Sequence, residues 1–233
     1  MPKLVSFEEA AALIHDGDTI MVGGFMGCGN PHDIIDVIAE LGIRDLTMIC
    51  NDASMPGGPM GEEHYGVAKL VHNRQIKRLI ATHVGLNPEV AAQSMQEGTL
   101  EVILIPQGSM AEMIRAGGAG LGGVLTPTGV GTIVEDSPLC LGRQTIHGRD
   151  YLLMDVLRAD VALIAGSKVD PEGNVWYRGA TSNFNTVMAT AADTVIVEAE
   201  KLVARGAIDP EDVRTPGVYV DYVVKGGRKS GSV

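Results

Sequence analysis

Aromatic side chains and cysteine are scarce in this sequence of 233 residues. Phe, Trp and Tyr make up 4% of the chain, and Trp176 is its single tryptophan. This composition is unlike that of an all-β sandwich and ordinary for an α/β protein with tightly packed loops. Cys28, Cys50 and Cys140 are too few and too scattered for a disulfide framework or a zinc site. We therefore expect a reducing, cytoplasmic environment.

Positive charge and long apolar runs are also scarce. The 18 Lys and Arg residues stand against 29 Asp and Glu, so the formal net charge is −11. This balance argues against a nucleic-acid partner, because such affinity comes largely from basic residues that neutralise phosphates. No stretch approaches the roughly 18 uninterrupted apolar residues of a membrane helix, and the first residues do not resemble a signal peptide. We therefore expect no membrane association, while a small anionic ligand stays compatible with the composition.

The chain has instead many apolar runs that alternate with amphipathic segments, and 45% of its residues are hydrophobic. A capping box at Ser6 and Glu9 predicts a helix to about His15, and Asn30 followed by Pro31 predicts the N-cap and first position of another. Further helices are predicted at 66–73, 87–98, 107–118 and 183–192. Apolar runs predict strands at 19–22, 46–50, 78–85, 100–106, 161–166 and 194–200.

Strands that alternate with helices across short connections indicate crossovers, and hence a largely parallel sheet. The fold class we predict is α/β, with one open, mostly parallel sheet and helices on both faces. The second half contains more extended structure, including a predicted hairpin within 139–156. No linker separates the halves, so we predict a single domain over residues 1–233, of which 225–233 form a frayed, glycine-rich tail.

Glycine is concentrated directly after the first of these predicted strands, in the stretch VGGFMGCGNP at 22–31. Glycine removes the Cβ either where a chain turns sharply or where something approaches the backbone closely. The second explanation would place an anion or oxyanion against free amides before the next helix. The dinucleotide pattern G-x-G-x-x-G fails because His32 occupies its sixth position, and the phosphate-loop pattern lacks its lysine.

The wider stretch DGDTIMVGGFMGCGNP, residues 16–31, resembles the signature of the A subunit of family I coenzyme A transferases. These are the acetate/butyrate–acetoacetate and succinyl–3-oxoacid CoA-transferases. Other segments resemble the same subunit in the same order, namely 44–52, 75–89, 100–132, 183–198 and 215–224. The likeness covers nearly the whole chain and is closest to the two-subunit, short-chain acetate/acetoacetate branch. It implies the CoA-transferase fold, which is similar to that of sugar-phosphate isomerases.

The resemblance implies a ping-pong exchange of CoA between a thioester and a free carboxylate. A glutamate attacks the acyl-CoA to give an acyl–glutamyl anhydride and then a glutamyl–CoA thioester, and the incoming acid reverses these steps. In the family that glutamate belongs to the B (beta) subunit, and neither Glu135 nor Glu172 of this chain has its sequence context. The chain is therefore expected to hold no catalytic residue of its own and to be active only with a B subunit, in a heterotetramer or hetero-octamer.

The resemblance also assigns site residues. The loop expected to bind coenzyme A, as the acyl-CoA substrate, consists of Gly23, Gly24, Phe25, Met26, Gly27, Cys28 and Gly29. The oxyanion and substrate pocket is expected to consist of Gly24, Phe25, Asn51 and Gln107. An amide aimed at a developing oxyanion can contribute roughly 3–4 kcal/mol. Asp52 departs from the Asn of some relatives, which affects that contact.

Two other segments enter this assignment. The glycine-rich segment 117–132 is expected to border the pocket, although a loop packed where only glycine fits explains it too. The basic cluster RQIKR at 74–78 is expected to be a solvated helix end, so the adenine part of CoA is assigned mainly to the partner. Short-chain carboxylates are the expected second substrate.

Cysteine and histidine provide weaker alternatives. A nucleophilic Cys28 thiolate would need a general base in electropositive surroundings, and nearby His32 lacks a third orienting group, so Cys28 is interpreted as a small apolar filler. The remaining histidines show no metal-binding spacing, and no metal is expected; they are His15, His64, His72, His83 and His147. Two other functions stay open: a sugar-phosphate-isomerase-like enzyme, which would need a general base in the same chain, and a non-catalytic acyl-CoA or organic-anion binding protein.

Overall fold

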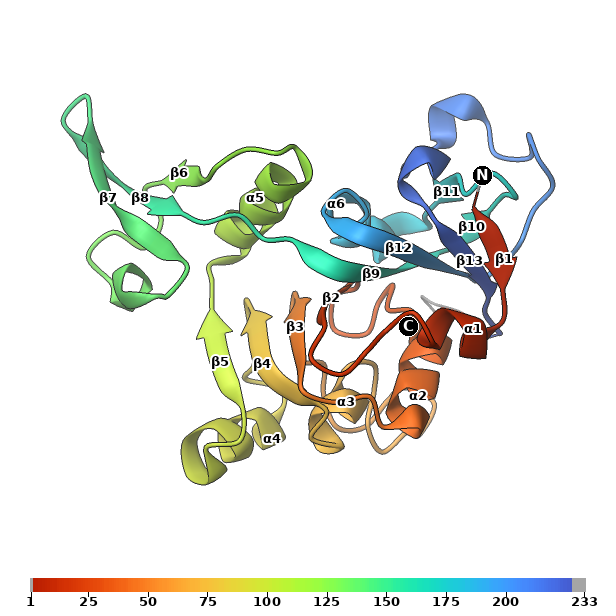
Figure 1. Ribbon diagram of the computed structural model, residues 1–233, viewed down its shortest axis with the longest axis horizontal. Helices are drawn as coiled ribbons and strands as arrows, with labels where there is room; N and C mark the ends of the chain where they lie inside the picture. Colours follow the sequence, from red (N-terminus) through yellow and green to blue (C-terminus); the bar gives the residue numbers. More distant parts are fainter. Residues whose placement is uncertain (1, 228–233) are drawn as a thin grey trace.

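The apolar runs of the sequence form the strands of one large sheet. The computed structural model describes residues 2–227, and its main sheet has eight strands in the order β1-β13-β12-β9-β2-β3-β4-β5 (Figure 1). Every neighbouring pair is parallel, which confirms the predicted fold class. The strands are β1 Lys3–Val5, β2 Thr19–Val22, β3 Leu46–Cys50, β4 Ile76–Ala81, β5 Glu101–Leu104, β9 Ala159–Gly166, β12 Ala192–Ala199 and β13 Tyr222–Lys225.

Alternate residues of these strands belong to two hydrophobic cores, one on each face of the sheet. Ile20 and Met48 contribute to one core, whereas Met21 and Ile49 contribute to the other, as the period of two in a strand requires. The first core is covered by α1 Phe7–Ala11, α2 His32–Leu41, α3 Ala68–His72 and α4 Pro88–Ala91. The second is covered by α5 Gln107–Gly118 and α6 Asn185–Met188. Helices therefore lie on both faces, as predicted (Figure 1).

Several helix boundaries differ from the predicted ones. The capping box at Ser6 and Glu9 is present, but the helix that it opens ends at Ala11. Asn30 does not cap α2, because its side-chain amide donates to Gly23 O at 2.5 Å instead, and Pro31 occupies the N-cap. Asn87 does cap α4, which continues into a π-helical turn, η1 Ala92–Glu97.

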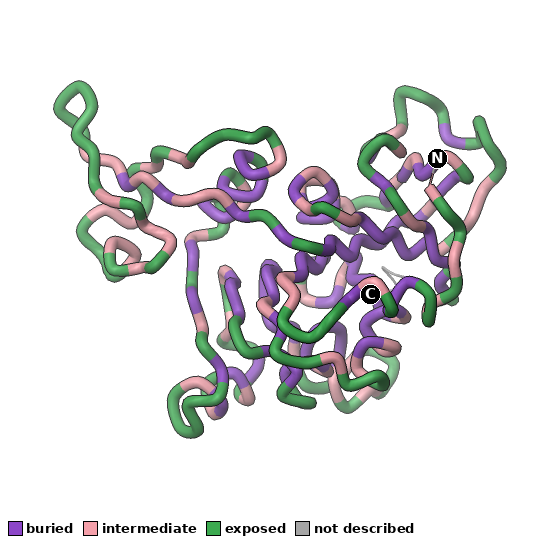
Figure 2. The backbone as a smooth tube through the Cα atoms, in the orientation of Figure 1, coloured by how far each residue is buried: buried purple, intermediate pink, exposed green. Residues whose placement is uncertain are grey.

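A three-stranded antiparallel sheet projects from the body of the protein as an arm (Figure 1). It consists of β6 Val124–Thr126, β7 Cys140–Ile146 and β8 Arg149–Met154, so the predicted hairpin is confirmed. Figure 2 shows that most of the outer arm is exposed, in contrast to the buried central strands. The remaining short elements are β10 Lys168–Val169, β11 Val175–Trp176 and the 3-10 helices η2 Ile133–Asp136, η3 Gly179–Ser182, η4 Pro210–Asp212 and η5 Gly217–Tyr219.

Order extends into the segment predicted to be a frayed tail. Lys225 ends β13, and the N–H groups of Gly226 and Gly227 donate to Ala199 O at 3.0 Å and to Asp33 Oδ2 at 2.6 Å. The rest of that predicted tail, 228–233, lies outside the described residues. Within residues 2–227, no helix has both the length and the apolar character that crossing a membrane requires.

The order of the strands determines where a ligand can bind. β2 lies between β3 and β9; from β2 the chain proceeds outward through β3, β4 and β5, and it later fills the other side through β9, β12 and β13. Such a reversal is a topological switch point, and in open α/β sheets the crevice at the carboxyl ends of the strands beside it receives ligands. The glycine loop, residues 23–29, begins at this point, directly after β2.

Candidate active site

The glycine loop forms a tight turn at the carboxyl end of β2. The N–H of Phe25 donates to Cys28 O and the N–H of Cys28 donates to Phe25 O, both at 2.9 Å. Met26 and Gly27, between them, have positive φ angles of 49° and 84°, the combination found in a type I′ turn. The Phe25 side chain is 42% exposed, so an aromatic ring is presented at the base of this turn.

All four glycines of the loop are required by close packing, and the contacts are tightest at Gly23 and Gly27. A Cβ on Gly23 would lie 1.9 Å from Asn185 Oδ1, and a Cβ on Gly27 would lie 1.8 Å from the ring of Tyr65. Asn185 is fully buried, and its amide group donates to Gly29 O at 2.9 Å and to Thr181 O at 2.8 Å. The missing side chains therefore allow Asn185 and Tyr65 to hold the loop from two sides.

Most backbone donors of the loop are already used within the protein. Gly23 N donates to Leu163 O at 2.9 Å, Gly24 N to Asn183 Oδ1 at 3.1 Å, and Met26 N to Asp52 Oδ2 at 2.8 Å. Only the N–H groups of Gly27 and Gly29 have no acceptor in the described part of the chain. The sequence suggested several free amides in this loop, whereas the structure leaves only these two backbone N–H groups without an acceptor among the described residues.

The N-terminus of α2, which follows the loop, is occupied by a carboxyl group of the protein itself. Glu198 is 2% exposed, and its Oε2 accepts from Ile34 N at 2.9 Å. The pKa of Glu198 is raised to about 8: burial raises it most, the hydrogen bond from Ile34 opposes this rise, and the nearby Asp33 carboxylate adds to it. This helix end is therefore filled by Glu198, and a ligand anion would have to bind elsewhere.

A chain of buried and partly buried hydrogen bonds connects the loop to α5. Asp52 Oδ2 accepts from Met26 N and from Asn51 Nδ2, each at 2.8 Å. Asn51 Oδ1 in turn accepts from Gln107 Nε2 at 2.6 Å and from Thr82 Oγ1 at 3.2 Å. Because Asn51 is 2% exposed and its side chain is fully engaged, it positions Gln107 and Asp52. Gln107 itself is exposed.

Two cavities lie beside Phe25. The first, of about 410 Å³, is lined by Phe25, Gln107, Gly108, Ala111, Asn183, Phe184 and Val187. The second, of about 460 Å³, is lined by Phe25, Met26, Cys28, Met55, Gly57, Gly58, Pro59 and Tyr65. The structure thus brings Gln107 and the glycine loop together, whereas Asn51 lies behind them. A third cavity, of about 350 Å³ between β5 and η2, shares no residue with the loop.

The groups considered as nucleophiles from the sequence lie elsewhere or are unsuited to the role. Glu135 lies on η2, where it accepts from Gly131 N at 2.5 Å and pairs with Arg143. Glu172 pairs with Arg205. Burial raises the pKa of the Cys28 thiol, which disfavours the thiolate. Among the described residues, neither cavity beside Phe25 is lined by a carboxylate.

Two further segments contribute little to these cavities. No residue of 117–132 lines either cavity beside Phe25. Gly117 and Gly118 instead allow close contact of α5 with Leu157 O and with Thr190. In the basic cluster at 74–78, Arg74 pairs with Glu97 and Arg78 pairs with Glu101, so its two arginines are neutralised locally.

Sequence reasoning missed the residues that hold the loop from the second half of the chain. Asn183 donates to Cys28 O at 2.9 Å and accepts from Gly24 N, and Asn185 donates to Gly29 O. The available signal was the paired Asn residues of the segment NFN, but a contact across more than 150 positions follows only from the sheet order. Reasoning from spacing also missed the grouping of His64, His72 and Glu89.

Comparison with known proteins identifies the family to which this chain belongs. The protein belongs to the class of α/β proteins with an open parallel sheet, and residues 4–226 match the family model described as "Coenzyme A transferase". This match covers nearly the whole chain, so the chain belongs to the coenzyme A transferase family.

Individual relatives place the chain more closely within this family. It is 48% identical over 223 residues to the acetoacetyl-CoA:acetate/butyrate CoA transferase alpha subunit of Clostridium acetobutylicum, and the match covers 96% of this chain and 97% of that one. It is 43% identical to the acetate CoA-transferase subunit alpha of Escherichia coli K12, with coverages of 95% and 96%. Among solved structures, the acyl-CoA transferase of E. coli O157:H7 in a thioester complex with CoA superposes with a TM-score of 0.88 at 21% identity. That match covers all of this chain and 49% of that one.

Proposed function

We propose that the chain is the alpha subunit of a short-chain acyl-CoA:carboxylate CoA-transferase of the acetate/butyrate/acetoacetate class. Two relatives with this kind of name match it over nearly their full length at 48% and 43% identity. The fold alone could not support the proposal, because the same architecture also occurs in a decarboxylase with a TM-score of 0.78, and one fold can host many reactions.

The observation that carries the proposal is the composition of the two cavities beside Phe25. Apolar groups, glycine backbone and the amides of Gln107 and Asn183 line them, but no carboxylate does among the described residues. Asp52, the nearest buried acid of the network, accepts hydrogen bonds from Met26 N, Asn51 Nδ2 and Ser54 N. In this proposal a beta subunit supplies the glutamate nucleophile and completes the active site at the interface between the chains, which agrees with the alpha-subunit names of the two relatives.

The reaction then proceeds in two balanced exchanges. The partner's glutamate carboxylate attacks the thioester carbonyl carbon, the C–S bond breaks, and CoA leaves as a thiolate while an acyl–glutamyl anhydride forms. The thiolate attacks the glutamyl carbonyl, which releases the first acid and leaves a glutamyl–CoA thioester for the incoming carboxylate. Each attack places negative charge on a carbonyl oxygen. Gln107, which lines the first cavity, is the donor that we assign to such an oxygen, whereas Gly27 and Gly29 are buried and line neither cavity.

The same proposal covers partners and location. The chain spans about half the length of the acyl-CoA transferase with the bound CoA thioester, which leaves room there for a second unit of similar size. We expect a heterotetramer or hetero-octamer in which the adenine part of CoA rests mainly on the beta subunit, because Arg74 and Arg78 are already paired. A cytoplasmic location agrees with the three free cysteines.

The test is an assay of the purified chain, alone and with its beta subunit, for CoA exchange between acetyl-CoA and acetoacetate. We expect turnover only with both chains. Mass spectrometry of the complex incubated with acyl-CoA should find the CoA adduct on a glutamate of the beta subunit. Turnover by the chain alone, or a CoA adduct on one of its own carboxylates, would contradict the proposal.

A further inference from the structure

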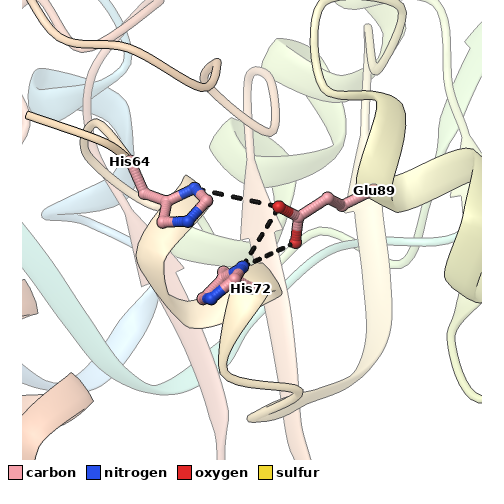
Figure 3. A group of neighbouring side chains, drawn as sticks. All are labelled: His64, His72 and Glu89. Carbon is pink, nitrogen blue, oxygen red and sulfur yellow. Dashed lines mark hydrogen bonds and ion pairs between the residues drawn. The ribbon is translucent and has the colours of Figure 1, made fainter.

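Three potential metal ligands meet on the helical layer formed by α3 and α4 (Figure 3). His64 comes from the loop before α3, His72 is the last residue of α3, and Glu89 lies in the first turn of α4. One ligand atom from each residue lies within 4.8 Å of the other two. Figure 3 shows a nitrogen of each imidazole directed toward the same carboxylate. The sequence separates these residues, so their spacing gave no metal-binding pattern.

The distances are close to those of a coordination shell. His72 Nδ1 lies 3.1 Å from both carboxylate oxygens of Glu89, and His64 Nδ1 lies 3.8 Å from Oε1. Zinc bonds to nitrogen and oxygen are about 2.0–2.2 Å long, so two ligands of one tetrahedral ion stand roughly 3.3 Å apart. The observed separations fall on either side of this value, and small side-chain movements would bring all three atoms to one ion.

His64 provides a second observation that points to a ligand. Its side chain is only 16% exposed, and its Nε2 is buried with no hydrogen-bond partner among the described residues. Its Nδ1, at 3.8 Å from Glu89 Oε1, is beyond hydrogen-bonding distance. A mostly buried imidazole without a hydrogen bond requires an explanation. An ion bound to Nδ1 would give this imidazole a partner on the side that faces Glu89, while Nε2 would stay buried without one.

The two imidazoles are also stacked, with ring centroids 3.8 Å apart and planes 25° from parallel. Coordination requires each nitrogen lone pair to point at the ion, so the rings must turn apart when the ion binds. The His72 side chain is 49% exposed and has room to turn, and Glu89 is 33% exposed. A water molecule can therefore reach a fourth position, as in zinc sites that have three protein ligands.

We propose that His64, His72 and Glu89 form a site for a divalent transition metal, with Zn²⁺ as the fitting ion. Two imidazoles and one carboxylate suit Zn²⁺ better than Mg²⁺ or Ca²⁺, which prefer oxygen ligands. Glu89 supplies the negative charge that partly balances the ion, and the net charge of −11 favours cations in general.

Such an ion would act as a clamp on the loop that borders the second cavity. His64 forms an isolated antiparallel β-bridge with Pro56 across the base of this loop. The next residue, Tyr65, lines the cavity, and its ring stacks on that of His32 with centroids 4.7 Å apart. The ion would tie this loop to the end of α3 and to the start of α4. It would thereby restrict the position of Tyr65 against the glycine loop.

The test is calorimetric titration of the EDTA-treated, full-length chain with Zn²⁺ alone. We expect one Zn²⁺ per chain, and binding weaker by more than about tenfold in His72→Ala and in Glu89→Gln. His15→Ala is the matched control, because the His15 side chain is 74% exposed and far along the chain from the cluster; it should leave the affinity unchanged. His72 is itself half exposed, so His72→Ala should keep the fold, which circular dichroism can verify.

Hydrogen exchange provides a readout that does not depend on activity. Zn²⁺ should slow amide exchange over 55–65 in the wild-type chain and have no such effect in His72→Ala. The absence of saturable Zn²⁺ binding, or binding that both ligand variants retain, would overturn the site. Binding at the cluster without slower exchange in the loop would overturn the clamp.

Discussion

Gln107 Nε2 donates a 2.6 Å hydrogen bond to Asn51 Oδ1, and this bond joins an exposed wall of the first cavity to a side chain buried at the carboxyl end of β3. The Asn51 side-chain amide donates a hydrogen bond to Asp52 Oδ2, and this oxygen also accepts from the N–H of Met26 in the glycine loop. Both walls of the proposed site are therefore held by one chain of hydrogen bonds, which passes through the buried Asn51 side chain. Substitutions at its exposed end and at its buried middle should affect different measurements.

The exposed end should matter for catalysis more than for stability. Gln107→Ala removes an amide that lines the cavity, and we expect kcat/KM of the two-subunit enzyme to fall by about 10²–10³-fold, the usual effect of deleting one oxyanion donor. The free energy of unfolding should change by only about 1 kcal/mol, the net contribution of one hydrogen bond. Gln96→Ala, on an exposed position of η1, is the matched control. A Gln107→Ala enzyme with nearly normal kcat/KM would remove Gln107 from the site.

The buried middle should matter for stability. Asn51→Ala deprives Gln107 Nε2 of its acceptor and Asp52 Oδ2 of a donor, whereas Thr82 Oγ1 keeps its 2.8 Å bond to the backbone O of residue 51. Leaving buried polar groups unpaired costs roughly 1–3 kcal/mol each, so we expect urea denaturation to show a loss of about 3 kcal/mol. Gln96→Ala, at an exposed position of η1, should change stability by less than about 0.5 kcal/mol. Equal effects of the two substitutions would contradict the role assigned to Asn51.

Packing against the glycine loop gives a third prediction. In Gly23→Ala the new methyl group would lie 1.9 Å from Asn185 Oδ1, and Asn185 cannot move without losing its bonds to Gly29 O and to Thr181 O. We expect a decrease in melting temperature of more than about 5 °C, because the clash costs several kcal/mol. Gly108→Ala is the matched control: it lines the first cavity on α5, and its Cβ would meet no atom within 4 Å. A Gly23→Ala chain as stable as Gly108→Ala would show that the loop can rearrange.

The sheet could be predicted from the sequence because local patterns encode it. Continuous apolar runs such as Thr19–Val22 and Leu46–Cys50 became buried parallel strands. The Ser6 cap formed as predicted, and the helix predicted from residue 87 has Asn87 as its N-cap. The prediction that Asn30 caps α2 was wrong because the Asn30 side chain donates to Gly23 O instead. Glu198, far along the chain, accepts from the N-terminus of α2. Tertiary contacts override local preference at such positions.

The site could be predicted only in part, for the same reason. The resemblance of residues 16–31 located the glycine loop, and the structure places Gln107 beside it. The physical explanation for Gly23 and Gly27 could not be derived, because the atoms that exclude a Cβ belong to Asn185 and Tyr65. The cluster of His64, His72 and Glu89 depends on how α3 packs against α4, which no sequence spacing records.

Buried Glu198 gives a pH-dependent prediction. Its pKa is raised to about 8 in the folded chain from an ordinary value of 4.5, so the folded state binds the proton more tightly than the unfolded state. The protonated form therefore stabilises the fold fully below about pH 4.5, and this contribution is lost as the pH rises through 8. Glu198→Gln keeps a neutral group at the same place and should remove this loss.

The measurement is the difference in melting temperature between wild type and Glu198→Gln at pH 6 and at pH 9. We expect the melting temperature of the variant, relative to that of the wild type, to be several degrees higher at pH 9 than at pH 6. About 1 kcal/mol shifts the melting temperature of a chain of this size by roughly 2–4 °C. Taking the difference cancels the titration of other groups that the two proteins share. Glu40→Gln, at an exposed position of α2, should track the wild type at both pH values. A constant difference between wild type and Glu198→Gln would mean that Glu198 is already ionised at pH 6, with its charge stabilised by the N-terminus of α2.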